Sequence, residues 1–143
     1  MNPMIKNICC MESNWRDKTL EYLEKKTWSP HDSDSRLIRR TKELRKIPLS
    51  TFETEDLRIM IGQQLSLDYL IPLALDTLKF DLFAAGDYFE GDLLKNVLAV
   101  ETGFWDNNQD YWMTLHDLIN NSRSEIAAKK FDTTHFDNCK YNN

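Results

Sequence analysis

The chain has 143 residues, of which 41% are hydrophobic and 11% aromatic, and its formal net charge is −5. This length suits one domain with its own core, and no apolar run is long enough to span a bilayer. The three cysteines, an odd number with two adjacent, match neither a disulfide framework nor a zinc site. We therefore expect a reduced, cytoplasmic protein without a metal, a cofactor or a membrane anchor.

Helical periodicity runs through the sequence, and only four glycines and four prolines interrupt it. No segment shows the strict alternation of a half-buried strand. The pattern predicts an all-α fold, a single compact domain of about six helices over residues 1–143, with poorly ordered tails at 1–13 and 131–143. The helices are expected near residues 14–26, 35–46, 54–64, 72–80, 92–98 and 111–119, the last fading toward residue 130.

Local signals place the ends of several helices. Thr54 and Asp92 are predicted N-caps, because their short polar side chains accept hydrogen bonds from first-turn backbone amides. Residues 65–80 are apolar nearly all round and should form the central helix. We expect this helix to begin near Pro72, because proline suits the first turn, and the alternative is one longer helix kinked at Pro72. Residues 101–108 are predicted to be a turn. The buried stripe of the second helix is predicted to be Leu37, Ile38, Thr41 and Leu44.

Charge is distributed unevenly along the chain. Residues 1–49 carry eleven basic and seven acidic side chains, whereas residues 76–117 carry two basic and nine acidic ones. Within this acidic block, "GDYFEGDLL" at residues 86–94 places two aromatic side chains among three carboxylates. Exposed aromatic side chains in acidic surroundings are typical of a surface that docks on a basic partner.

Two other classes of function stay open. A nucleic-acid-binding module would use the basic helix, through Arg36, Arg39, Arg40, Arg45 and Lys46. That helix could instead pair with the acidic middle of the chain inside the fold. A small hydrolase would use Asp87, Asp92 and His116, which would then have to meet in one pocket. A calcium loop at residues 106–117 is excluded because Tyr111 stands where glycine is required.

A series of short motifs lies between residues 44 and 94. They are Leu44-Arg45-Lys46 with Pro48-Leu49, Thr54 to Leu57, Ile61-Gly62-Gln63-Gln64, Leu70 to Leu75, Gly86-Asp87 and Gly91-Asp92-Leu93-Leu94. Together they resemble the bacterial immunity proteins of contact-dependent growth inhibition (CDI). The resemblance covers about residues 14–119 and is most specific from "IGQQ" through "GDLL". The residues before Met11 depart from it, which leaves Met1 and Met11 as alternative starts.

The resemblance implies a cytoplasmic protein that binds and neutralises the C-terminal toxin domain of a CDI system. Many such toxins are nucleases, often cutting tRNA, and immunity comes from one-to-one occlusion without catalysis. No contact with a membrane or with nucleic acid is implied. A nuclease surface is basic because it binds phosphate, so an acidic inhibitor is its electrostatic complement. We expect the toxin-binding residues to be Asp76, Asp81, Asp87, Tyr88, Phe89, Glu90, Trp105 and Asp106.

Overall fold

The computed structural model describes residues 13–139, and over this range the chain forms helices without a strand. The predicted all-α class is confirmed, although several predicted helices are divided into shorter ones. None of the described helices is both long and apolar enough to cross a membrane. The α-helices are α2 (Leu20–Glu24), α3 (Arg36–Leu44), α4 (Thr54–Gly62), α5 (Leu67–Phe80), α6 (Asp92–Leu98), α7 (Thr102–Asp106), α8 (Gln109–Asn120), α9 (Arg123–Ala128) and α10 (Thr134–Asn138). Two 3-10 turns, η1 (Trp15–Asp17) and η2 (Leu49–Thr51), complete the set.

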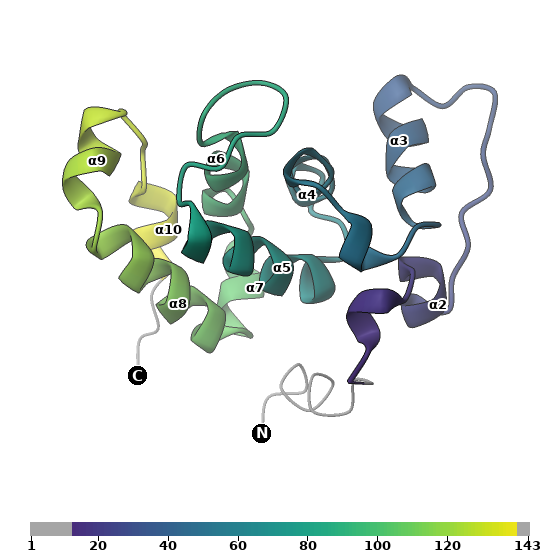
Figure 1. Ribbon diagram of the computed structural model, residues 1–143, viewed down its shortest axis with the longest axis horizontal. Helices are drawn as coiled ribbons and strands as arrows, with labels where there is room; N and C mark the ends of the chain where they lie inside the picture. The colour runs from purple at the N-terminus through teal and green to yellow at the C-terminus, as the bar shows by residue number, and fades with distance from the viewer. Residues whose placement is uncertain (1–12, 140–143) are drawn as a thin grey trace.

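The centre of the molecule is built from α4, α5 and α6 (Figure 1). Helix α5 packs against α4, α6 and α8, and its Leu70, Ile71 and Ala74 are fully buried. This confirms the prediction that residues 65–80 contain the central helix. Helix α3 stands to one side of the centre, and α8, α9 and α10 lie on the other side (Figure 1).

The prediction that the central helix begins near Pro72 is wrong. Helix α5 begins at Leu67 and contains Pro72 in its second turn. A proline inside a helix costs about 3 kcal/mol. Burying one large aliphatic side chain contributes about 1.5–3 kcal/mol, and Leu67, Leu70 and Ile71 are all buried through this extra turn. Tertiary packing therefore outweighs the local preference.

Residues 14–26 and 101–108 also differ from prediction. Instead of one helix, η1 and α2 follow one another, because the Thr19 hydroxyl accepts a hydrogen bond from the Tyr22 amide and starts a new helix. The expected turn at 101–108 contains α7, which buries Phe104 and Trp105. At α4 the N-cap is Glu53 rather than Thr54, since the Asp56 carboxylate accepts the Glu53 N–H and completes a capping box.

The C-terminal segment is better packed than the sequence suggested. Residues 131–143 were expected to be a poorly ordered tail, but α10 inserts a fully buried Phe136 into the core. The Trp112 indole N–H donates to the Phe136 carbonyl oxygen at 2.9 Å, and the two rings stack. One large aromatic side chain thus anchors an otherwise polar segment. Residues 140–143, like the predicted N-terminal tail up to residue 12 with Cys9 and Cys10, lie outside the described part of the chain.

Helix α3 buries only its C-terminal half. Thr41 and Leu44 are buried as predicted, but Leu37 and Ile38 are 41% and 39% exposed, so that half of the predicted stripe is wrong. The periodic pattern identified the correct helix face. The N-terminal half of α3 projects beyond the other helices of the described part of the chain (Figure 1).

Arg45, the residue that follows α3, fixes this helix to the N-terminal segment. Its side chain is 1% exposed and forms an ion pair with Glu24. The same guanidinium donates to the Lys26 carbonyl oxygen at 2.8 Å and lies 4.3 Å from the centre of the Trp28 ring. A single buried cation therefore connects α3, α2 and the loop between them.

We expect Arg45→Met to lower the free energy of unfolding by about 2–3 kcal/mol, because it leaves Glu24 without its cation. The low end of the range for buried pairs applies since the Glu24 side chain is 29% exposed. Urea denaturation at neutral pH measures the change. The control is Arg39→Met at an exposed site of the same helix, which should change stability by less than about 0.5 kcal/mol. Equal losses in both variants would contradict the anchoring role of Arg45.

Candidate functional site

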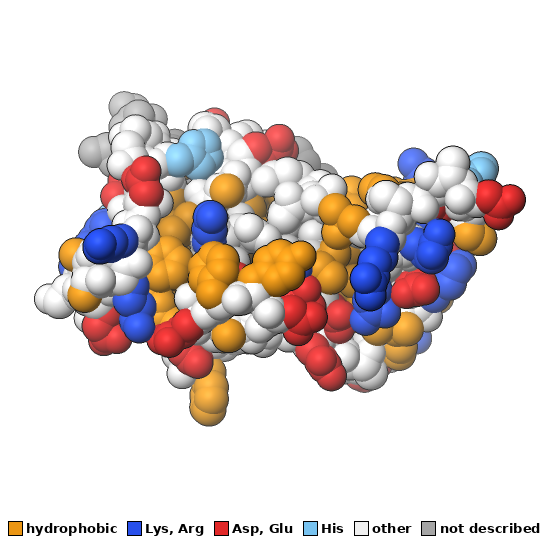
Figure 2. Space-filling view, turned by 90° about the horizontal axis from the view of Figure 1, so that it is seen from above, with side chains coloured by type: hydrophobic (Ala, Val, Ile, Leu, Met, Phe, Trp, Pro, Cys, Tyr) orange, Lys and Arg blue, Asp and Glu red, His pale blue; other side chains and the backbone are white. Residues whose placement is uncertain are grey.

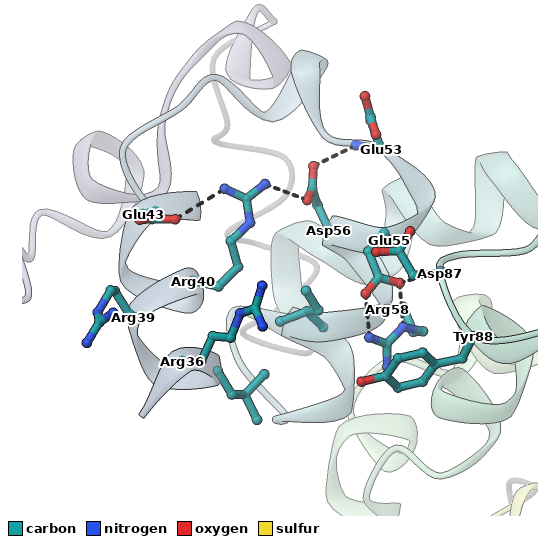
Figure 3. A pocket seen from close by; sticks show the side chains of 12 residues that line it. Arg36, Arg39, Arg40, Glu43, Glu53, Glu55, Asp56, Arg58, Asp87 and Tyr88 are labelled. Carbon is teal, nitrogen blue, oxygen red and sulfur yellow. Dashed lines mark hydrogen bonds and ion pairs between the residues drawn. The ribbon is translucent and has the colours of Figure 1, made fainter. Parts of the chain in front are cut away.

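An open cleft of about 870 Å³ separates α3 from α4 and from the loop that joins α5 to α6. Arg36, Leu37 and Arg39 line its α3 side, and Ile59, Asp87 and Tyr88 line the opposite side. Figure 2 shows hydrophobic side chains gathered in the middle of this face, with Lys and Arg side chains over the arm at the right and also at the left. The residues around the cleft are drawn in Figure 3.

The loop at residues 81–91 is organised by Asp92. This carboxylate is buried and accepts hydrogen bonds from the backbone amides of Gly86 at 2.6 Å, Tyr88 at 3.0 Å and Phe89 at 3.3 Å. The N-cap of α6 is Gly91, with a φ of 88°, and Asp92 is the first helical residue. The prediction that Asp92 is the cap is therefore wrong. Its side chain turns back to the preceding loop instead of forward to its own helix.

Helix α4 supplies a second anchor for the same loop. The Glu55 carboxylate accepts the Asp87 N–H at 2.8 Å and two guanidinium bonds from Arg58, at 2.6 and 2.5 Å. The Arg58 guanidinium also lies 4.1 Å from the centre of the Tyr88 ring (Figure 3). It lies 3.7 Å from the Asp92 carboxylate. A side chain at position 86 would collide with Glu55, so glycine is needed there.

These carboxylates are stabilised in their charged forms. Burial alone would raise the pKa of Asp92, but the amides of the loop and the Arg58 guanidinium outweigh it, and its pKa lies below the ordinary value. For Glu55, the hydrogen bonds from Arg58 lower the pKa against the opposing effect of burial. Both groups therefore accept hydrogen bonds from the loop as anions at neutral pH.

The anchored loop presents its aromatic side chains to solvent. Tyr88 is 74% exposed and Phe89 is 46% exposed. Asp87 and Glu90 are exposed beside them, and Glu90 forms a surface ion pair with Lys129 at 2.9 Å. Four of the predicted site residues are thus neighbours on one loop of fixed conformation, which suits contact with another macromolecule.

The other four predicted residues are more scattered. Asp76 and Asp81 are exposed at the C-terminal end of α5, where Asp76 pairs with Arg16 at 3.2 Å. Asp106 is exposed on α7. Trp105 is fully buried and packs edge-on against Phe136, so its prediction as a surface contact is wrong. A tryptophan in a short segment carries no sequence signal that distinguishes an exposed anchor from a core residue.

The hydrolase alternative gains no support from the arrangement. Asp92 is occupied by its own loop, whereas His116 stacks on Trp112 and hydrogen-bonds with Asn120 at 2.9 Å. Asp87 lines the cleft, and neither of the other two residues does. Between residues 13 and 139, no cluster of His, Cys, Asp and Glu side chains is placed to hold a metal ion.

The basic helix is largely neutralised within the fold. Arg40 bridges Glu43 and Asp56, Lys42 pairs with Asp34, and Lys46 pairs with Glu21. Arg45 is buried, which corrects its prediction as a nucleic-acid contact. Arg36 and Arg39 are the exposed cations of this predicted set for which no carboxylate partner occurs within the part of the chain that the structure describes. Two isolated cations are a small basis for binding a nucleic acid.

Sequence reasoning missed several residues of the site. Glu55 and Arg58 lie about thirty positions before the loop that they hold, so no local motif connects them with it. Phe80, the last residue of α5, is 95% exposed and adds a further aromatic group near Asp76 and Asp81. Its place in the apolar run of residues 65–80 gave no sign of this exposure.

We expect Asp92→Asn to destabilise the protein by about 1–3 kcal/mol at pH 7, since a charged acceptor of three amides is lost. Because the folded-state pKa of Asp92 is depressed, its charge stabilises the fold above the unfolded pKa of about 4. That contribution is lost as the pH falls through the folded value. Urea denaturation at pH 7 and near pH 3 measures the free energy of unfolding. We expect the difference between Asp92→Asn and wild type to be smaller near pH 3 than at pH 7.

The matched control for this measurement is Asp117→Asn, which changes an exposed carboxylate on α8. It should alter stability by less than about 0.5 kcal/mol at either pH. If the loss caused by Asp92→Asn were equally large at both pH values, the charge of Asp92 would not be what organises the loop.

Comparison with known proteins identifies the family. The family model described as CDI immunity proteins matches residues 22–128, which is well over half of the chain and includes α3, the cleft and the loop at 81–91. No curated protein and no solved structure matches. The chain therefore belongs to the family of CDI immunity proteins, those of contact-dependent growth inhibition.

Proposed function

We propose that this protein binds its cognate CDI toxin domain in a one-to-one complex, in the cytoplasm, and neutralises it through the loop at residues 86–91. Membership of the immunity family supports the class of partner. The observation that carries the choice of surface is the exposure of Tyr88 and Phe89 on a loop whose backbone is fixed by buried Asp92. Neutralisation by occlusion requires no chemical step from this chain.

The anchoring of the loop favours tight binding. A mobile loop must lose conformational freedom when it docks, and each ordered side chain costs about 0.5–1.5 kcal/mol. Here the amides of residues 86–89 are already bonded to Asp92 and Glu55 in the free protein. Tyr88 is also restrained by Arg58 beneath its ring. Aromatic side chains held in this way are the usual hot spots of protein interfaces.

The charge around the loop favours a basic partner, and we propose a nuclease, with a tRNA-cleaving enzyme as one form. Asp87 and Glu90 flank the two aromatic side chains, and Asp76, Asp81 and Asp106 add negative charge elsewhere on the surface. A nuclease carries a cationic surface that binds the phosphates of its substrate. These carboxylates would therefore speed the association with the toxin and compete with the substrate for its cationic side chains. Trp105 is no part of this surface, because it is buried.

The first test is co-expression of the whole chain with the toxin domain encoded beside it, followed by calorimetry on the purified pair. We expect a one-to-one complex with a Kd in the nanomolar range, equivalent to about −12 kcal/mol, and loss of toxin activity in the complex. A toxin that stays active and unbound at micromolar concentrations of this protein would refute the proposal.

Reversing the charge of the loop should weaken the complex. We expect the double variant Asp87→Lys, Glu90→Lys to raise Kd by about tenfold to a hundredfold, with most of the change in the association rate at low salt. The fold should persist, since the Glu90 ion pair with Lys129 is exposed and contributes little. Asp117→Lys on α8, which reverses one exposed charge and makes half of this charge change, is the control and should leave Kd within about threefold of wild type.

A further inference from the structure

Arg36 stands out among the cations of α3. Arg40, Lys42 and Arg45 each pair with a carboxylate, whereas the side chain of Arg36 has no hydrogen bond or ion pair within residues 13–139. Arg36 is also the first residue of α3, where the helix dipole makes a cation unfavourable. Its position therefore does not contribute to the stability of the isolated fold.

The cleft around Arg36 contains both charged and apolar side chains. Its guanidinium points from α3 into the cleft, toward the side that carries Arg58 and Tyr88, whereas Arg39 points away from that side (Figure 3). Leu37, 41% exposed, lies on the same wall, and Ile59 lies opposite. Arg58 already has Glu55 and Asp92 as partners. Among residues 13–139, the guanidinium groups that line this cleft without a carboxylate partner are those of Arg36 and Arg39, and of these two Arg36 points toward Arg58 and Tyr88 (Figure 3).

We propose that this cleft receives an acidic segment of the cognate toxin, with a toxin carboxylate on Arg36 and an adjacent apolar side chain between Leu37, Ile59 and Tyr88. The occupant follows from charge complementarity, because the unpaired Arg36 guanidinium accommodates an anion. Leu37, Ile59 and Tyr88 lie on the walls among the charged side chains of the cleft and can contact an apolar group. The inference rests on the proposed function: Tyr88 belongs to both the loop surface and the cleft, so a toxin docked on the loop lies at the mouth of the cleft.

A charge reversal at Arg36 distinguishes this direct contact from the general attraction between an acidic inhibitor and a basic toxin, because the two predict opposite changes in Kd. Arg36→Glu makes the protein more acidic, so long-range attraction alone would leave binding unchanged or strengthen it. A direct bond to a toxin carboxylate would instead become a repulsion. The same substitution places an anion at the N-terminal end of α3, so the urea unfolding midpoint should stay the same or rise.

The experiment measures Kd by calorimetry for the full chain and its cognate toxin domain, with wild type, Arg36→Glu, Arg36→Lys and Arg39→Glu. We expect Arg36→Glu to weaken binding by at least about tenfold. Arg36→Lys should weaken binding less than Arg36→Glu, because lysine keeps the positive charge but cannot form the bidentate bond of arginine. Arg39→Glu is the control of identical charge change on the same helix, and it should weaken binding several-fold less.

The outcomes separate the two proposals. If wild type binds and Arg36→Glu binds as tightly or more tightly, the cleft contact is wrong while the proposed function stands. Equal weakening by Arg36→Glu and Arg39→Glu would also overturn the inference, since it would reflect the field of the whole helix. The absence of any wild-type complex would overturn the proposed function and this inference with it.

Discussion

The buried carboxylate of Asp92 is the interaction on which the candidate surface depends. It lies at the start of α6, yet it accepts the amides of a loop that precedes this helix and contacts Arg58 from α4. An isolated buried anion would cost several kcal/mol, so Asp92 is compatible with the fold only because the loop closes over it. The loop in turn depends on Asp92 for its amide bonds. The packing of α6 against α4 and the conformation of the preceding loop therefore depend on each other.

Sequence reasoning located the helices whose buried face is long enough to repeat, although it placed the start of α5 too late. Helices α4, α5 and α8 each carry several apolar residues at helical spacing, and these residues are buried in the structure. The failures concern segments in which tertiary contacts decide. Local preference predicts a helix start at Pro72 and a turn at Gly103, but both residues lie inside helices that bury neighbouring side chains. Local preference was outweighed there by the free energy of burial.

The candidate site was predictable only in part, for a related reason. Composition was enough to predict that residues 87–90 lie at the surface, because acidic and aromatic residues between two glycines form no core pattern. It could not identify Glu55 and Arg58 as the anchors, since their contacts with the loop span about thirty residues or more. Nor could it separate Trp105, a core residue, from Tyr88, an exposed one. Exposure is a property of the assembled fold.

Internal pairing also changes the meaning of the charge pattern. The excess of cations before residue 50 suggested a basic face, yet Arg40, Arg45 and Lys46 have carboxylate partners. Within residues 13–139, subtracting these pairs leaves a mainly acidic loop next to a cleft in which Arg36 and Arg39 have no carboxylate partner. A surface of a single sign attracts any partner of the opposite sign, in many orientations. Adjacent patches of both signs favour a partner with the matching arrangement and disfavour others by like-charge contact, which is how an inhibitor of one toxin can fail to recognise the next.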